Sequence, residues 1–272
     1  MSAPRRYELT DFEWSIIAPL LPNKPRGVPR ADDRKVLNGI YWRLRTGSPW
    51  ADIPERYGPP TTCSNRFRRW AKIGVWDRIF EAVSRAYDGD LQMIDSSSIR
   101  VHQHGGNVKK GGHTPARSVP RPPLGTTLEP SGMGRSRGGL TTKIHALVDA
   151  NGLPVALKLT EGQAHDGVSA SDMLETLSEG QILLADRAYD SDRLRNALRE
   201  RGVFANVRPM KSRKRRLPFS SWLYRQRNLV ERFFSKLKHY RAVATRYEKH
   251  AANFLAAVKL AAARIWMRFM SR

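Results

Sequence analysis

The chain has 272 residues, of which 40% are hydrophobic and 27% charged, so it can fold as one large domain or as two smaller ones. Its formal net charge of +23 at pH 7 favours a polyanionic partner, and nucleic acid is the first candidate. The single cysteine, Cys63, excludes a disulfide framework within the chain and a zinc site built on a cysteine cluster.

The N-terminal third is typical of a helical region. Helices are expected over residues 8–21, 32–46 and 61–87. Thr10 and Glu13 fit a capping box at the start of the first helix, because each side chain can bind the other residue's backbone amide. Gly47 suits the end of the second helix, and Gly74 divides the third stretch into two short helices.

Five of the seven tryptophans lie in this region: Trp14, Trp42, Trp50, Trp70 and Trp76. The simpler interpretation is that they form the core of a small helical domain, which we place at residues 1–88. The alternative adds a function: a helix-turn-helix whose basic face lies along DNA. That face would carry Arg66, Arg68, Arg69 and Lys72.

From about Leu91 the pattern changes to alternating strands and helices. Strands are expected over residues 91–104, turning polar after Asp95, on both sides of the turn at 149–152, and within 182–189 and 203–209. Helices are expected over 168–177, 192–201 and 221–240. This order predicts an α/β domain over residues 89–272, built on a mixed five-stranded sheet flanked by helices.

Residues 104–139 interrupt this domain with a basic stretch that holds nine glycines and five prolines. A loop of this length is typical of a functional arm or of an unstructured insertion. Its composition suits an arm on a phosphate backbone, but composition does not separate the two interpretations.

Two of the expected strands end in an aspartate. Met93 and Ile94 lead into Asp95, and the apolar run from Ile182 leads into Asp186. Asp186 alone fits the cap of a following turn, but a carboxylate on a buried strand is costly unless a cation is paired with it. Hard oxygen ligands and a polyanionic partner indicate Mg²⁺, in a site that can hold two ions.

The stretch Ser221–Tyr240 predicts a helix with one polar stripe. Tyr224, Arg227, Glu231 and Lys238 fall within roughly 60° of one another around the helix axis. Such a stripe can be a solvated ion-pair face, but apolar residues cover much of the remaining circumference, so we expect it to face a cleft. From Arg208 onward the chain has eighteen Lys and Arg residues against two acids, which favours a DNA-facing surface here.

Other candidates carry weaker signals. The basic run from Lys211 to Arg216 is expected to grip the DNA backbone, through Lys211, Arg213, Lys214, Arg215 and Arg216. His102 and His104 form a His-x-His pair, but without a third ligand a zinc site is disfavoured. His145 is expected to be structural. The first residues lack the apolar run of a signal peptide, and three cations interrupt Ala251–Met270, so we expect a cytoplasmic protein.

Asp95, Asp186 and Glu231 resemble the acidic triad of the DDE transposases of bacterial insertion sequences, in the IS-five family and its IS-four-like relatives. Tyr224, Arg227, Glu231 and Lys238 match the family's Y-x2-R-x3-E-x6-K signature at every position. The stretches GRSRGGLTTKIHALVDANG and EGQAHD are also similar to that family, and the resemblance spans nearly the whole chain. The stretch from about Gly105 to Pro130 is expanded relative to the family.

The resemblance implies a ribonuclease H-like catalytic domain that cuts and joins DNA. The three acids would hold two Mg²⁺ ions, for which Mn²⁺ could substitute. Tyr224, Arg227 and Lys238 would contact the double-stranded DNA of the terminal inverted repeats and the target. A homodimer or larger assembly on DNA is expected, associated with the bacterial nucleoid. Two alternatives stay open: a non-catalytic DNA-binding protein, and a nuclease of the same fold that does not join strands.

Overall fold

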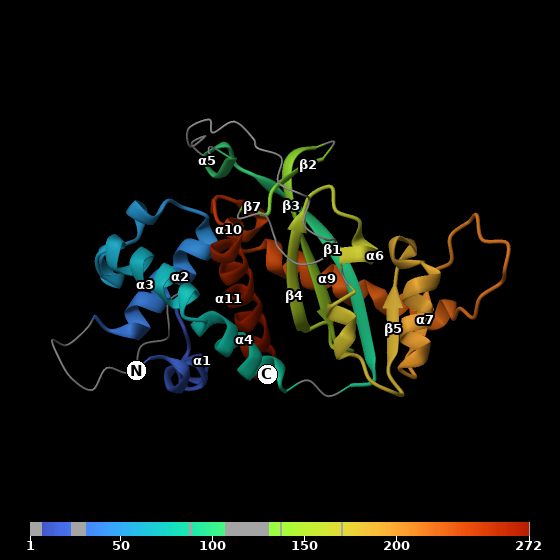
Figure 1. Ribbon diagram of the computed structural model, residues 1–272. Helices are drawn as coiled ribbons and strands as arrows, with labels where there is room; N and C mark the ends of the chain where they lie inside the picture. The colour runs from blue at the N-terminus through green and yellow to red at the C-terminus, as the bar shows by residue number, and fades with distance from the viewer. Residues whose placement is uncertain are drawn as a thin grey trace.

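The computed structural model describes residues 7–22, 31–86, 89–106, 131–136, 138–169 and 171–271 (Figure 1). Helices of the N-terminal third lie on one side of the long helix α11 (Ala251–Met270), and the sheet lies on its other side. Most of the expected loop at 104–139 falls outside the described residues, as do residues 87 and 88 at the expected domain boundary. The described parts of that loop belong to α5 (Gln103–Gly106), to β2 (Gly134–Ser136) and to the start of β3.

The N-terminal helices follow the local signals, except that the first is shorter than the expected 8–21: it ends at Ile17, and a 3₁₀ turn at Ala18–Leu20 follows it. They are α1 (Asp11–Ile17), α2 (Asp33–Thr46), α3 (Pro60–Lys72) and α4 (Val75–Ser84). Thr10 and Glu13 form both bonds of the capping box. Gly47 has φ +74° and Gly74 has φ +70°, a left-handed conformation that glycine adopts at low cost. Trp70 and Trp76 are fully buried and pack edge to face at 5.2 Å, so they belong to the core.

Five strands form the body of the sheet: β1 (Leu91–Val101), β3 (Gly139–Val148), β4 (Pro154–Glu161), β5 (Ile182–Ala185) and β6 (Phe204–Val207). Their order across the sheet is β4-β3-β1-β5-β6. The β1–β3 and β3–β4 pairs are antiparallel, whereas β5 runs parallel to both β1 and β6. This is the mixed five-stranded, ribonuclease H-like sheet that we expected. Two short strands extend it, β2 beside β3 and β7 (Thr245–Arg246) beside β1.

Two helix predictions need correction. The expected helix over 168–177 consists of two short pieces, α6 (Asp166–Ser169) and a 3₁₀ turn at Met173–Thr176. Lys158 binds the Ser169 carbonyl at 2.6 Å and the Asp172 carboxylate at 2.7 Å, which holds this segment against β4. The expected helix over 221–240 is likewise divided, into α8 (Ser221–Tyr224), a 3₁₀ turn at Arg225–Arg227 and α9 (Asn228–Lys238).

The hydrophobic core lies on both faces of the sheet. On one face, α9 packs against β1 and β3 and α11 packs against β4, and the same cluster continues into α1 to α4. On the other face, α7 (Asp192–Glu200) and the 173–176 turn cover Ile94, Leu147 and Leu183. Because α11 joins the N-terminal helices to the sheet in one core, the boundary at 88/89 stays a prediction. No helix in the described part of the chain is long and apolar enough to cross a membrane.

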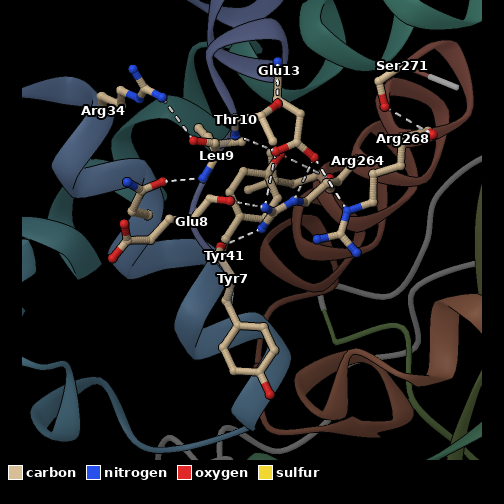
Figure 2. A network of polar contacts seen from close by, with 12 residues as sticks. Tyr7, Glu8, Leu9, Thr10, Glu13, Arg34, Tyr41, Arg264, Arg268 and Ser271 are labelled. Atoms are coloured by element: carbon tan, nitrogen blue, oxygen red, sulfur yellow. Dashed lines mark hydrogen bonds and ion pairs between the residues drawn. The ribbon is translucent and has the colours of Figure 1, made fainter. Parts of the chain in front are cut away.

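A buried ion pair links the two ends of this core. Figure 2 shows Arg264 of α11 reaching Glu13 of α1, with two nitrogen–oxygen contacts of 3.1 Å. Arg264 also donates to the carbonyls of Tyr7 and Glu8, at 2.6 and 2.5 Å. The side chains of Arg264 and Glu13 are each 2% exposed, and the exposed Arg268 lies farther from the same carboxylate, at 3.5 Å, so Arg264 is the main compensation for the buried charge of Glu13.

Candidate active site

Asp95 lies on β1, and Asp186 directly follows the neighbouring parallel strand β5. Met93 of β1 pairs with Leu184 of β5; Asp95 is two residues farther along β1, and Asp186 is two residues past Leu184 and still extended. Since side chains alternate between faces along a strand, each aspartate points to the same face as the residue two positions before it. Met93 and Leu184 belong to the core on the α9 face. Both carboxylates are therefore directed toward the face that α9 covers.

α9 brings a cation and a third acid to these aspartates. Nη2 of Arg227, at the start of α9, lies 2.7 Å from Oδ2 of Asp95. Nη1 of the same guanidinium lies 3.1 Å from Oε1 of Glu231, one helical turn farther on. Arg227 and Asp95 are mostly buried, at 13% and 17% exposed, whereas Glu231 is 61% exposed. One guanidinium thus binds a carboxylate of the sheet and a carboxylate of the helix.

The pKa shifts show that all three acids act on this guanidinium. Burial raises the pKa of Asp95, and the nearby charge of Asp186 raises it further, while Arg227 opposes the shift. Burial would lower the pKa of Arg227, but the combined charge of Asp95, Tyr224, Asp186 and Glu231 raises it. The site is therefore a concentration of negative charge that is compensated in part by one arginine.

The residues suit a hard divalent ion by their chemistry, because carboxylate oxygens are the ligands that Mg²⁺ prefers. Within the described ranges, however, no group of three acidic, histidine or cysteine side chains is close enough to hold a metal ion. Arg227 lies between Asp95 and Glu231 instead. Sequence reasoning placed Arg227 on DNA and missed this second role, although its i, i+4 spacing to Glu231 was a visible signal.

Asp186 has a structural role as well. Its carboxylate accepts a hydrogen bond of 2.9 Å from the Ala188 amide and caps the 3₁₀ turn at Arg187–Tyr189, as the simpler interpretation held. This turn places Tyr189 beneath the site, where it is 1% exposed. Burial raises the pKa of Tyr189, and the charges of Asp166, Asp95 and Asp186 raise it further, so its hydroxyl stays protonated. In the sequence, the signal for placing Tyr189 near the site was its position three residues after Asp186.

The other two signature residues lie on the two flanking pieces of the divided helix, Tyr224 at the end of α8 and Lys238 at the end of α9. Tyr224 is half-buried, with its ring 5.3 Å from that of Phe219 and the Arg208 guanidinium 5.7 Å away. Lys238, in the last turn of α9, is exposed. Both can reach a ligand that approaches along α9.

The basic run at 211–216 divides into two groups. Lys211, Lys214, Arg215 and Arg216 are exposed. Arg213 instead lies 2.7 Å from Asp190 and 2.6 Å from Asp192, so its prediction as a DNA contact is corrected to an internal ion pair. Ser191 caps α7, and Asp190 is a buried acid that binds both Arg213 and Arg195.

The expected basic face of α3 has fewer exposed arginines than predicted. Arg66 is 7% exposed and pairs with Asp33 of α2, with its guanidinium 5.2 Å from the Trp70 ring. It packs inside the helical region and is not available to DNA, which corrects the prediction. Arg68 and Arg69 are exposed, and their contact with DNA through a helix-turn-helix stays a prediction.

Of the histidines singled out in the sequence, His102 and His104 lie together and His145 is buried. The His102 and His104 rings are 4.8 Å apart, but among the residues described no third ligand joins them. His145 is fully buried and shares a 2.8 Å hydrogen bond with the Thr160 hydroxyl, which confirms its structural role.

Two protein families match this chain. Residues 9–80 match the family described as "Putative transposase of IS4/5 family", and residues 87–266 match the family described as "Transposase DDE domain". The second match includes Asp95, Asp186 and Glu231 and covers more than half of the chain, which thus carries a transposase DDE domain. Together these matches show that the chain belongs to the DDE transposases of IS4/5-family insertion sequences.

Individual relatives agree with the family. The chain is 41% identical over 133 residues to the "Putative transposase for insertion sequence element IS6501" of Brucella ovis, covering 47% of this chain and 100% of that one. It is 33% identical over 142 residues to the "Putative transposase for insertion sequence element IS402" of Burkholderia cepacia, covering 48% and 64%. Among solved structures, the pre-cleavage Mos1 transpososome aligns over 92% of this chain and 82% of that one, with 12% identity. Its TM-score of 0.26 is too low to support any argument.

Proposed function

We propose that this transposase binds the ends of an insertion sequence and catalyses metal-dependent DNA strand cleavage and strand transfer. One observation carries the proposal: within the matched DDE region, Asp95 of β1 and Glu231 of α9 bind the same guanidinium, and the charge of Asp186 acts on it as well. A protein that only binds DNA needs no such concentration of acids beside its basic C-terminal third.

Each residue then has a role. Asp95, Asp186 and Glu231 would hold two Mg²⁺ ions, with Mn²⁺ as a substitute; such ions activate the attacking oxygen and stabilise the leaving one. Arg227 orients the two carboxylates that it binds and offers a planar fork suited to phosphate oxygens. Lys238 supplies a phosphate contact at the end of α9, and Tyr224 supplies an aromatic surface for a base.

The partner is double-stranded DNA, both the terminal repeats and the target, because the family and the net charge of +23 favour it. Four exposed cations precede α8 and would follow the backbone of this DNA: Lys211, Lys214, Arg215 and Arg216. Joining two element ends requires them to be held together, so the working unit is a homodimer or a larger assembly. Its expected place is the bacterial cytoplasm, on the nucleoid.

The test is cleavage of DNA that carries the element's two boundaries. Glu231→Gln should reduce cutting in Mg²⁺ by about 100-fold or more, since charge stabilisation by a metal is worth several kcal/mol. Binding of the ends, measured by gel shift, should be unchanged. Glu200→Gln, an exposed residue of α7, is the matched control and should cut as the wild type does.

Three results would contradict parts of this proposal. Full cutting by Glu231→Gln would show that Glu231 is not part of the catalytic site. No cutting by the wild type, with intact end binding, favours the non-catalytic DNA-binding alternative. Cutting without any joined product favours a nuclease that lacks strand transfer.

A further inference from the structure

A cavity of about 770 Å³ lies where the N-terminal helices face the far end of β1. Its walls come from the end of α2 and the turn after it, from α3, from the residues after β1, and from the segment between β7 and α11 (Figure 1). His102 lines it and follows Asp95 by seven residues along β1, a span of about 23 Å in an extended strand. The cavity is therefore separate from the carboxylate site.

A buried arginine in the cavity wall has unused hydrogen-bonding capacity. Arg43 is 4% exposed; its Nη2 lies 3.2 Å from Glu248, and its guanidinium lies 4.8 Å from the Trp50 ring. Its Nε and Nη1 are buried, and neither finds a hydrogen-bond partner in the described part of the chain. Leaving such a donor unpaired is costly, so an acceptor that enters the cavity would be stabilised there.

The charge of the cavity favours an anion. Arg43, Arg68 and Lys249 line it, and Glu248 is the one acidic side chain among the lining residues. Arg68 and Lys249 are exposed, so they can meet a ligand at the mouth while Arg43 meets it inside. Burial lowers the pKa of Arg43, and a bound anion would oppose that shift.

Aromatic rings occupy the same walls. The His102 ring lies 4.8 Å from the rings of both His104 and Tyr247, and Trp50 lines the side that Arg43 covers. Bases stack on such rings without regard to sequence, and cations beside them bind the phosphate backbone. Cavities of roughly 300–1,000 Å³ hold small molecules, so this one suits one or two nucleotides rather than a duplex.

We propose that this cavity binds an unpaired nucleotide of the transposase's DNA. Arg43, Arg68 and Lys249 hold its phosphate, and its base stacks on the rings of Tyr247 and His102. The proposal rests on the proposed function in one respect, that DNA is the partner. A span of about 23 Å corresponds to about seven steps of 3.4 Å along a DNA strand, so one DNA molecule can reach this cavity and the carboxylate site together.

The test compares a labelled blunt duplex with the same duplex carrying a short oligothymidine overhang, at the 3′ end and, separately, at the 5′ end. Affinities are measured by fluorescence anisotropy in EDTA, so the outcome does not depend on cleavage. The wild type should bind an overhang probe about tenfold more tightly than the blunt probe, because stacking of a base is worth about 1–3 kcal/mol.

Two variants and two controls locate the effect. Arg68→Ala and Tyr247→Ala should each abolish the gain from the overhang, whereas Tyr247→Phe keeps a ring and should retain it. Arg69→Ala removes the same charge from the adjacent exposed position and should weaken both probes equally, leaving the gain intact.

Equal affinity of the wild type for blunt and overhang probes would overturn the proposal. So would a gain that survives in either Arg68→Ala or Tyr247→Ala, or one that is lost equally in Arg69→Ala. Near-ultraviolet circular dichroism identifies any variant with altered packing; if Tyr247→Ala is altered, Arg68→Ala, which changes an exposed side chain, still decides the question against its control Arg69→Ala. Failure here with intact Mg²⁺-dependent cutting would leave the proposed function standing, and the converse also holds.

Discussion

Replacing Arg227 with glutamine tests whether this arginine and divalent ions compete for the same carboxylates. The change removes the charge that lies 2.7 Å from Asp95 and 3.1 Å from Glu231. The three acids, whose charges all act on Arg227, would then repel one another without compensation. We expect a less stable protein whose stability depends strongly on Mg²⁺.

The size of the loss follows from the burial of each pair. A hydrogen bond to a mostly buried charge such as Asp95 contributes about 1.5–3 kcal/mol, whereas the pair with exposed Glu231 contributes about 0–1 kcal/mol. A total near 2 kcal/mol should lower Tm by about 4–8 °C for a chain of this size. An ion present at 100 times its Kd stabilises by about 2.7 kcal/mol, which is enough to close that gap.

The assay is thermal unfolding of both proteins across a Mg²⁺ titration. The variant should gain more from Mg²⁺ than the wild type, so the two Tm values converge as Mg²⁺ rises. Arg232→Gln, on the exposed surface of α9, is the control and should follow the wild type throughout. A gap that stays constant or widens with Mg²⁺ would refute the reasoning that guanidinium and metal share these acids.

Two further predictions concern stability. Arg264→Met should lower the free energy of unfolding in urea by about 3–5 kcal/mol, because buried Glu13 loses its buried partner. Arg268→Met, which changes a side chain that is 55% exposed, should lower it by less than about 1 kcal/mol. Similar losses in the two variants would contradict the buried-pair argument. Burial lowers the pKa of His145 to about 4, so the native state resists a proton that the unfolded state accepts below pH 6.5. The free energy of unfolding should therefore fall by up to about 3 kcal/mol as the pH drops from 6.5 toward 4. In His145→Asn the free energy of unfolding should depend less steeply on pH. An unchanged pH dependence would show that His145 does not cause it.

Local signals predicted the elements of this fold. The capping box of Thr10 and Glu13, the glycine at 47 and the turn at 149–152 each depend on residues a few positions apart, which a single sequence displays directly. The aspartates at 95 and 186 were found because a charge that ends an apolar strand is costly, wherever the strand lies.

Long-range contacts could not be predicted in the same way. The partner of Arg66 is 33 residues away on α2, and Asp190 binds arginines from α7 and from the basic loop. An exposed cation and a buried, paired one look alike in sequence. The stripe along 221–240 assumed one helical period, but the 3₁₀ turn at Arg225–Arg227 advances by about 120° per residue and rotates Tyr224 relative to Glu231.

The link between Glu13 and Arg264 bears on how the protein is made. These residues are 251 positions apart, so about 10–50 s of synthesis separates them at common translation rates. Until α11 leaves the ribosome, the earliest helices have exposed apolar faces and an acid without its partner. A polypeptide that terminates before α11 would therefore be a target for proteases, so synthesis of α11 acts as a checkpoint on folding.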